Sequence, residues 1–453
     1  MLGRRPQEPQ ELWVATTDLV RGPGHALYEK LNELLAEAGF DRWVEDLCEP
    51  YYAPVGRTGI PPGVSFRMIL AGYFEGVSAQ RAIAWRCADS LSRKSFLGFG
   101  PTEETPHHSS LTNCHQRLPL AVHEEVFQFV LGLAAEKKLL KGLRVGVDAT
   151  TLEANAALKS LVRRDPLDDY PESLRRLAVE QGVPIESDDD LRRFDQQRKG
   201  KSLKNDEWVS ESDPEARITQ RKDGPTHLAY KAEHTVDLDT DLVVAVQIAP
   251  GDAGDTTTLP VSLETADRNL LLAGAEHEIR EVAADQGYHK TELIHDQTLL
   301  GRRTYIREPQ RHDRRQWLDK PVGDQSAVYA NRRRMCGDHG KALHKKRSAL
   351  CERSFAHVCE TGGARRCWLR GLETVTKRYL FQVAARNLSV ILRKLFGIGT
   401  PRGLNGLAGF VSFLQLALSP LQNALGLRGH FQPLSHQPVT DHSQFRVDLQ
   451  IAP

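Results

Sequence analysis

Three carboxylates in this chain occupy positions from which they could bind metal ions together. Asp148 follows the apolar segment LRVGV, Asp285 follows IREVAA and precedes Gln286-Gly287, and Glu352 lies in a helical stretch. Carboxylate oxygens are the ligands that Mg²⁺ and Mn²⁺ prefer. Two such ions about 3.5–4 Å apart can hold the attacking and the leaving oxygen of a phosphodiester displacement. Metal-assisted phosphoryl transfer is therefore the chemistry to consider.

Basic residues gather around the third carboxylate. Residues 301–380 contain 20 Lys and Arg against 8 Asp and Glu, whereas the whole chain has a net charge of +1. A charge run is usually a solvated face, but this one directly precedes Glu352, which favours contact with nucleic-acid phosphates. The candidate cations are Arg332, Arg333, Arg334, Lys341, Lys345, Lys346, Arg347, Arg365, Arg366 and Arg370. Trp317 and Trp368 could stack on unpaired bases, although core packing is the commoner role.

The elements that must position the carboxylates form an α/β layer with a mixed sheet. The segments HLAYKAEHTVDLDT and DLVVAVQIAP predict a hairpin that turns at Asp239–Asp241,. Strands are expected at 143–148, 279–284 and 304–306, with helices from Thr258, over 291–300, around 350–358 and over 372–395,. Each Asp would then close a strand, at the edge where sites in such sheets collect.

The remaining segments differ in apolar spacing and in charge. Residues 1–142 form an N-terminal region whose apolar spacing predicts several helices from about residue 16,. Residues 161–215 hold 10 Lys and Arg and 15 Asp and Glu, which predicts a charged insertion or flexible loop with one amphipathic helix near Leu174–Leu177,. The sheet domain would comprise 143–160 and 216–395, and the tail 396–453 has no assigned role.

Composition excludes several classes of protein. The chain has 453 residues, enough for two to four domains, and 40% apolar residues, which is ordinary globular composition,. The first twenty residues lack the apolar segment of a signal peptide, and polar residues and Pro420 interrupt Leu404–Leu427,. Seven cysteines, an odd number, favour a reducing cytosol over a disulfide framework,.

Other clusters of possible ligands carry less weight. Asp237, Asp239 and Asp241 alternate as expected for a hairpin tip rather than a metal site. The Cys and His residues between 336 and 359 match no tight zinc spacing,. Glu360 and Glu373 rival Glu352, but Cys351, Phe355 and Val358 define an apolar stripe with Glu352 at its margin.

Three segments resemble the DDE transposases of bacterial insertion sequences, whose catalytic domain is ribonuclease-H-like. They are VGVDATTLEANA at 145–156, VAADQGYHK at 282–290 and ERSFAHVCETGGARRCWLRGLE at 352–373. NLSVILRKL at 387–395 is similar to the closing helix of that family. FRMILAGYFEGVSAQRAIAWRC at 66–87 is similar to its N-terminal helical domain. The resemblance extends over roughly residues 16–395.

The resemblance implies that Asp148, Asp285 and Glu352 are the catalytic residues and bind Mg²⁺ or Mn²⁺, two ions in all. It implies cleavage of insertion-sequence ends and strand transfer into target DNA by a 3′-hydroxyl. The helical domain would bind element ends or dimerise, and the partner would be double-stranded DNA. We expect a homodimer or larger assembly at synapsis, in the bacterial cytoplasm at the nucleoid.

Departures from the family pattern leave alternatives open. The segment HHSSLTNCHQRL at 107–118 has His107 where the family has an acidic residue, and Asn113 or His115 where it has arginine. Gln286 stands where the family has lysine after the second Asp. A catalytically inactive or domesticated DNA-binding protein is the main alternative. A nuclease that hydrolyses without joining strands is a third hypothesis.

Overall fold

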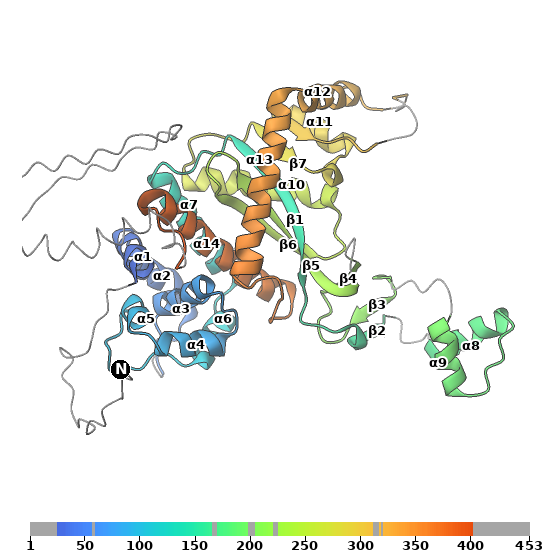
Figure 1. Cartoon of the computed structure of the whole chain (residues 1–453), viewed down its shortest axis with the longest axis horizontal. Coiled ribbons are helices and arrows are strands. Elements are labelled where there is room, and N and C mark those ends of the chain that lie inside the picture. The colour runs from blue at the N-terminus through green and yellow to red at the C-terminus, as the bar shows by residue number, and fades with distance from the viewer. Residues whose placement is uncertain are drawn as a thin grey trace, which may run out of the picture.

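The structure is a computed structural model. It describes residues 25–56, 59–164, 170–197, 204–220, 225–310, 317–318 and 320–401. Within these ranges, helices surround a central sheet, and a bundle of helices lies beside it (Figure 1). The predicted tail, including Leu404–Leu427, lies outside the described residues from 402 onward.

The N-terminal region is helical, as its apolar spacing predicts. It comprises α1 (Ala26–Glu37), α2 (Phe40–Cys48), the short helix η1 (Glu49–Tyr51), α3 (Pro62–Glu75), α4 (Gln80–Ala88), α5 (Leu91–Phe96), α6 (His108–Arg117) and α7 (Leu120–Glu136). Pro62 begins α3, and Gly76 ends it in a left-handed conformation,. The buried Arg67 guanidinium forms a bidentate pair with Asp41 and so ties α3 to α2,.

The sheet is mixed. Its strands are β1 (Arg144–Glu153), β4 (Arg217–Gln220), β5 (Thr226–Asp237), β6 (Val243–Pro250), β7 (Glu281–Ala284) and β8 (Arg303–Ile306). Strand β5 pairs antiparallel with β1 on one side and with β6 and β4 on the other, which confirms the predicted hairpin. Strands β7 and β8 continue the sheet beyond β1 in parallel.

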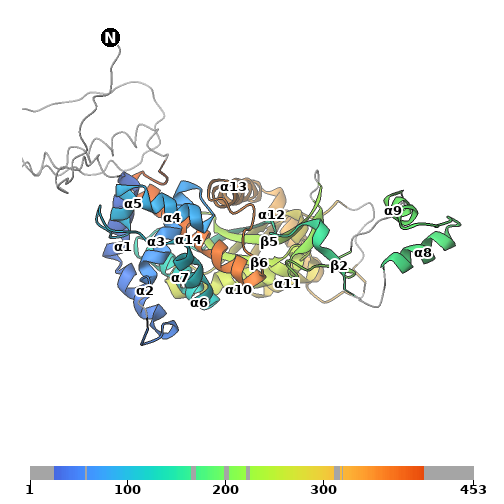
Figure 2. The ribbon, with the colours of Figure 1, turned by 90° about the horizontal axis from the view of Figure 1, so that it is seen from below.

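Helices cover both faces of the sheet. Alternate residues of β5 point to opposite faces: Glu233 bonds to Thr258 and Ser262 of α10 (Asp255–Ala273), whereas His234 bonds to Ser354 of α13 (Asp338–Phe355). Figure 2 shows α13 on one side and α10 with α11 (Thr291–Leu299) on the other. Between β8 and α13 lies α12 (Asp324–Cys336), which the sequence did not predict because its apolar residues are few.

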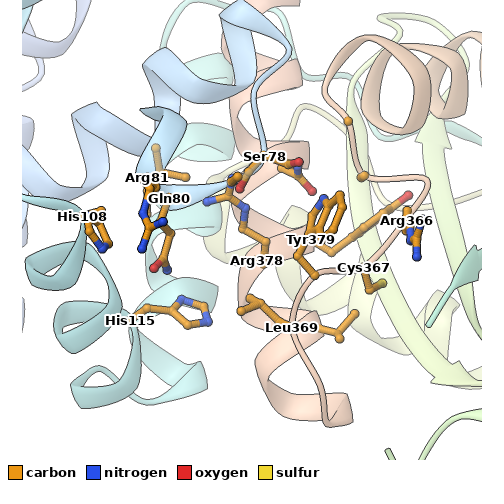
Figure 3. A pocket seen from close by; sticks show the side chains of 17 residues that line it. Ser78, Gln80, Arg81, His108, His115, Arg366, Cys367, Leu369, Arg378 and Tyr379 are labelled. Atoms are coloured by element: carbon orange, nitrogen blue, oxygen red, sulfur yellow. The ribbon is translucent and has the colours of Figure 1, made fainter. Parts of the chain in front are cut away.

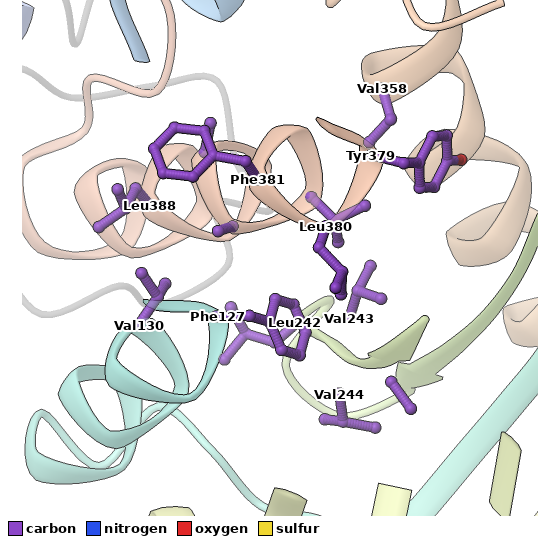
Figure 4. Packing of buried hydrophobic residues seen from close by; sticks show 14 of the residues in the cluster. Phe127, Val130, Leu242, Val243, Val244, Val358, Tyr379, Leu380, Phe381 and Leu388 are labelled. Carbon is purple, nitrogen blue, oxygen red and sulfur yellow. The ribbon is translucent and has the colours of Figure 1, made fainter. Parts of the chain in front are cut away.

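The last helix joins the two regions. Helix α14 (Leu372–Phe396) follows the π-helical turn η4 (Ala356–Thr361) and packs on α7 and β6. Figure 4 shows Leu380 and Leu388 on the side of α14 that faces Phe127 and Val130 of α7 and the apolar residues that begin β6, whereas Phe381 points to the other side. The Phe381 ring also stacks on Phe66 of α3 at 5.2 Å between centroids. The helical region and the sheet therefore share one hydrophobic core.

The charged insertion folds as a helical hairpin on a short stalk. Strands β2 (Leu161–Arg163) and β3 (Trp208–Ser210), after the single turn η2 (Leu158–Ser160), form the stalk, and α8 (Tyr170–Glu180) and α9 (Asp188–Gln197) form the hairpin. Leu174, Ala178, Leu191 and Phe194 make a separate small core. The sequence predicts only the first helix, because three consecutive aspartates begin the second. Figures 1 and 2 place the hairpin away from the sheet.

No single helix in the described part of the chain is long and apolar enough to cross a membrane. The α6–α7 pair, bent by 98°, passes that test by length and composition only.

Candidate active site

The register of two parallel strands sets the distance between the first two carboxylates. Val147 of β1 pairs with Ala284 of β7, and Asp148 and Asp285 are the next residues on each strand. The prediction that Asp148 closes its strand is wrong, because β1 continues to Glu153 through its pairing with β5. Only the pairing with β7 stops at Val147. Asp148 therefore lies inside a strand, at the point where the neighbouring strand turns away.

A buried arginine occupies the space in front of Asp148. Nη1 of Arg347 lies 3.0 Å from Oδ2 of Asp148, and Nη2 lies 3.9 Å from Oδ1 of Asp285. The arginine stem crosses β1 at Gly146, where an added Cβ would lie 2.8 Å from Cγ of Arg347. Gly146 and Asp148 share one face of the strand. Because Gly146 has no side chain, the Arg347 side chain can pass over it and place its guanidinium beside Asp148.

The pKa of Asp148 depends on the other two predicted carboxylates. Burial raises the pKa of Asp148 above its usual range, and the carboxylates of Asp285 and Glu352 raise it further,. Arg347 and the Ala149 backbone amide oppose that rise. The pKa of Asp148 therefore responds to both of the other predicted carboxylates.

A buried hydrogen-bond network anchors the turn that carries Asp285. Asp285 precedes η3 (Gln286–Tyr288), and its side chain is 56% exposed. The hydroxyl of Tyr288 donates to Oε2 of Glu233 at 2.9 Å beneath the turn. Burial and the Glu233 carboxylate raise the pKa of Tyr288, so the phenol stays protonated,. Thr258 donates to the same carboxylate at 2.6 Å, and Nζ of Lys231 bonds to Asp255 at 2.7 Å.

Glu352 lies on the exposed margin of α13. Cys351, Phe355 and Val358 are buried as predicted, whereas Glu352 faces solvent and accepts a 2.6 Å hydrogen bond from Ser348. The helix changes to the π-helical turn η4 directly after Phe355, a distortion that is frequent at functional sites,. The rival Glu360 lies on that turn and pairs with Arg365 at 2.7 Å. Glu373 pairs with Lys377 at 2.7 Å on α14.

The donor set suits a hard divalent cation. It consists of three carboxylates, which are oxygen ligands of the kind that Mg²⁺ binds. Two of them raise the pKa of the third, which shows that their negative charges are not fully balanced. Arg347 supplies part of the balancing positive charge, but its Nε has no hydrogen-bond partner among the described residues. No group of three His, Cys, Asp or Glu in the described chain is already placed to hold a metal ion. The chemistry of the site therefore fits Mg²⁺ or Mn²⁺, while Arg347 is the cation closest to Asp148.

The predicted DNA-contacting cations of α12 and α13 have different surroundings. Arg332 pairs with Glu308 at 2.7 Å and Lys346 with Asp239 at 3.2 Å, both on the surface. Arg334 donates to the Thr304 carbonyl at 3.0 Å, and its burial lowers the pKa of its guanidinium. Arg333, Lys341 and Lys345 are exposed. Arg347 faces the carboxylates rather than the surface.

The second group of cations surrounds the far end of β1. Arg365 donates to Thr150 and to the Thr151 carbonyl at 3.0 Å each, and Arg370 to the Asn155 carbonyl at 3.1 Å. Arg366 is exposed, and its guanidinium lies over the Trp368 ring at 5.3 Å. The Trp368 side chain itself is 55% exposed, so it is not a core residue.

Two buried pairings near the site were not predicted. His234 bridges Ser354 of α13 and Tyr379 of α14, with bonds of 2.8 and 2.9 Å. Its burial lowers the pKa of the imidazole well below the usual value, so the ring is neutral. At the hairpin tip, Asp241 pairs with the buried Arg386. Asp237 accepts from the amides of residues 141, 142 and 239. The acidic tip is therefore structural.

Comparison with known families agrees with this fold. A model of the DUF772 transposase domain matches residues 16–117, and a model of the transposase DDE domain matches residues 191–388. No curated protein and no solved structure matches the chain. A helical region followed by a mixed sheet with helices on both faces is the ribonuclease-H-like architecture expected above. The chain belongs to the DDE transposases of insertion sequences.

Proposed function

We propose that this transposase cleaves the ends of its insertion sequence and joins them to target DNA, with Asp148, Asp285 and Glu352 as the catalytic carboxylates. The observation that carries the proposal is the β1–β7 register, which sets Asp148 beside Asp285. The effect of Glu352 on the pKa of Asp148 supports its place in the same site. The two transposase domain matches supply the class of reaction.

Each residue has a distinct part in this proposal. The three carboxylates would hold Mg²⁺ or Mn²⁺, which supplies Lewis-acid stabilisation of the phosphoryl oxygens and activates the attacking hydroxyl when bound. Tyr288 and Glu233 position Asp285 by fixing the turn after β7. Arg347 balances the charge of Asp148 and Asp285 before the ligands are engaged. Ser348 orients Glu352 through its hydroxyl.

The exposed cations supply contacts to the DNA backbone in this proposal. Arg333, Lys341 and Lys345 face solvent on α12 and α13, the helices that lead to Glu352. Neutralising phosphates with such residues makes affinity fall with salt. DNA as the substrate would also place the protein at the nucleoid, and pairing of two ends would require two or more copies.

The direct experiment is a cleavage and joining assay with DNA that carries the element ends, in Mg²⁺ or Mn²⁺. We expect nicked ends and strand-transfer products from the native protein. Asp148→Asn, Asp285→Asn and Glu352→Gln should each lower product formation at least 100-fold while retaining DNA binding in EDTA.

Other outcomes select the alternatives. Binding without nicking by the native protein in both metals would indicate an inactive or domesticated DNA-binding protein. Nicking without strand transfer would indicate a nuclease. Full activity of all three variants would overturn the assignment of the carboxylates.

A further inference from the structure

A cavity of about 420 Å³ lies between the two transposase domains, away from the three carboxylates. One wall comes from α4, α6 and the Ser78–Arg81 segment of the helical region, and the other from residues 363–369 and α14 (Figure 3). Its volume is within the range of about 300–1,000 Å³ that is usual for small-ligand sites. The segment 363–369 follows Glu352 in the chain and pairs with the end of β1 through Arg366 and Glu153.

The wall of this cavity contains a half-buried cation, Arg378 of α14. Its Nη2 donates to the Ser78 carbonyl at 3.1 Å, and none of the described ion pairs joins it to a carboxylate. Burial alone lowers the pKa of its guanidinium, to about 10. None of the described residues that line the cavity is Asp or Glu, whereas Arg81 and Arg366 also line it. Three arginines line the cavity without a carboxylate beside them and would attract a negative charge, so the cavity suits an anionic group.

His115 of α6 offers a complementary polar atom. The side chain is buried, and Nε2 has no hydrogen-bond partner among the described residues. In the neutral tautomer with the proton on Nδ1, Nε2 presents a lone pair. Burial lowers the pKa of His115 to about 3, so the ring stays neutral. Figure 3 shows this ring directed toward α14 across the cavity. It can accept a hydrogen bond from an N–H donor of a ligand.

Apolar and aromatic residues make up much of the remaining lining, beside the polar Ser78, Gln80, His108 and Gln382. Ile69, Leu369, Val375 and Tyr379 line the interior, and Trp368 lies at the edge with more than half of its ring exposed. The site thus combines a cation for an anionic group, an acceptor for an N–H donor and faces for a flat apolar body.

We propose that this cavity binds one unpaired nucleotide of a DNA strand, with its phosphate at Arg378 and its base against Trp368 within reach of Nε2 of His115. The inference rests on the proposed function, since it requires DNA as the partner. It adds a nucleotide-binding site formed jointly by the DUF772 and DDE domains. DNA held there would be fixed to both domains at once, so that the strand leads from the helical region toward the catalytic sheet.

The test is binding of fluorescein-labelled oligo-dT of eight nucleotides, measured by anisotropy in EDTA, beside an abasic strand of the same length. Base stacking contributes about 1–3 kcal/mol, so the native protein should bind oligo-dT at least about 5-fold more tightly. Trp368→Ala and His115→Phe should abolish that preference. Arg378→Gln should weaken both strands about 10-fold. Arg42→Gln, an exposed cation on α2, should change neither, and circular dichroism melts should show that every variant is folded.

Equal affinity for the two strands, or variants that bind like Arg42→Gln, would overturn the proposal. Competition by inorganic phosphate as effective as that by thymidine monophosphate would also overturn it, because the cavity would then hold an anion only. Glu352→Gln should keep the base preference unchanged. Normal base preference with no cleavage of element ends by the native protein would contradict the proposed function and leave the nucleotide site standing.

Discussion

Asp148 and Asp285 each come one residue after the last paired residues of adjacent parallel strands, Val147 and Ala284. The backbone of β1 and β7 therefore sets their spacing, whatever the conformation of the surrounding loops. Arg347 lies between the two carboxylates and contacts both. The acidic site is thus built on rigid strands and is already partly neutralised by a side chain of the protein.

Removal of this internal cation should destabilise the protein. In Arg347→Met the stem still fits over Gly146, but Asp148 loses its nearest positive charge. We expect a loss of about 2 kcal/mol in the free energy of unfolding, below the range for fully buried pairs because the Asp148 side chain is 25% exposed,. Urea denaturation measures it. Millimolar Mg²⁺ should restore more stability to the variant than to the native protein.

The double variant Arg347→Met/Asp148→Asn completes a double-mutant cycle on the free energy of unfolding for this pair. A coupling of at least about 1 kcal/mol is expected if the two side chains stabilise one another. Additive losses would show that Arg347 acts through packing alone.

Tyr288→Phe should show whether Tyr288 positions Asp285 for catalysis or only stabilises the fold. The variant loses one donor to the buried carboxylate of Glu233, which costs about 2 kcal/mol,. Asp285 should then lose its fixed position, so kcat for end cleavage should fall at least 10-fold with little change in KM. Tyr305→Phe on β8 removes a similar 2.9 Å bond to Glu281 of β7 and is the matched control. Equal kinetic effects of the two variants would refute a positioning role for Tyr288.

Stability should fall in mild acid because burial lowers the pKa of at least three histidines, His115, His123 and His234. Burial lowers the pKa of His115 to about 3 and that of His123 to about 4, whereas an unfolded chain titrates near 6.5. Below pH 6.5 the unfolded state binds more protons than the folded state, so stability decreases as pH falls toward 4. Each histidine contributes a slope of about 1.4 kcal/mol per pH unit in that window.

Urea midpoints between pH 7.5 and 4.5 test this dependence. His115→Phe should make the curve less steep, whereas replacement of the exposed His277 by Gln should leave it unchanged. Parallel curves for the native protein and His115→Phe would contradict the expectation.

The helical hairpin should be dispensable for folding. Its Leu174, Ala178, Leu191 and Phe194 form a core separate from the main one. Replacement of residues 165–203 by a short Gly-Ser linker between β2 and β3 should keep the melting temperature within about 5 °C, since loop-closure entropy changes slowly with length. Loss of cooperative unfolding would show that the hairpin supports the sheet.

The sequence predicts the strands and the hairpin because their apolar patterns are local. It does not predict the length of β1, since Leu152 is the one large apolar residue among residues 149–153, which extend the strand by pairing with β5. The position of Arg347 was also missed. It stands in a run of cations that suggests a surface, and only its burial shows otherwise. Gly146, two residues before Asp148 on the same strand face, is the one local indication that a neighbouring side chain passes there.

The identity of the third carboxylate is the central claim, and one comparison tests it most directly. Glu352→Gln and Glu360→Gln remove the same charge from α13 and from the π-helical turn η4 that follows it. Glu352 raises the pKa of Asp148, whereas Glu360 pairs with Arg365. The measurement is the rate of Mg²⁺-dependent cleavage of element ends by the two variants. A loss of at least 100-fold in Glu352→Gln with near-native activity in Glu360→Gln is the predicted result. Near-native cleavage by Glu352→Gln would contradict the account.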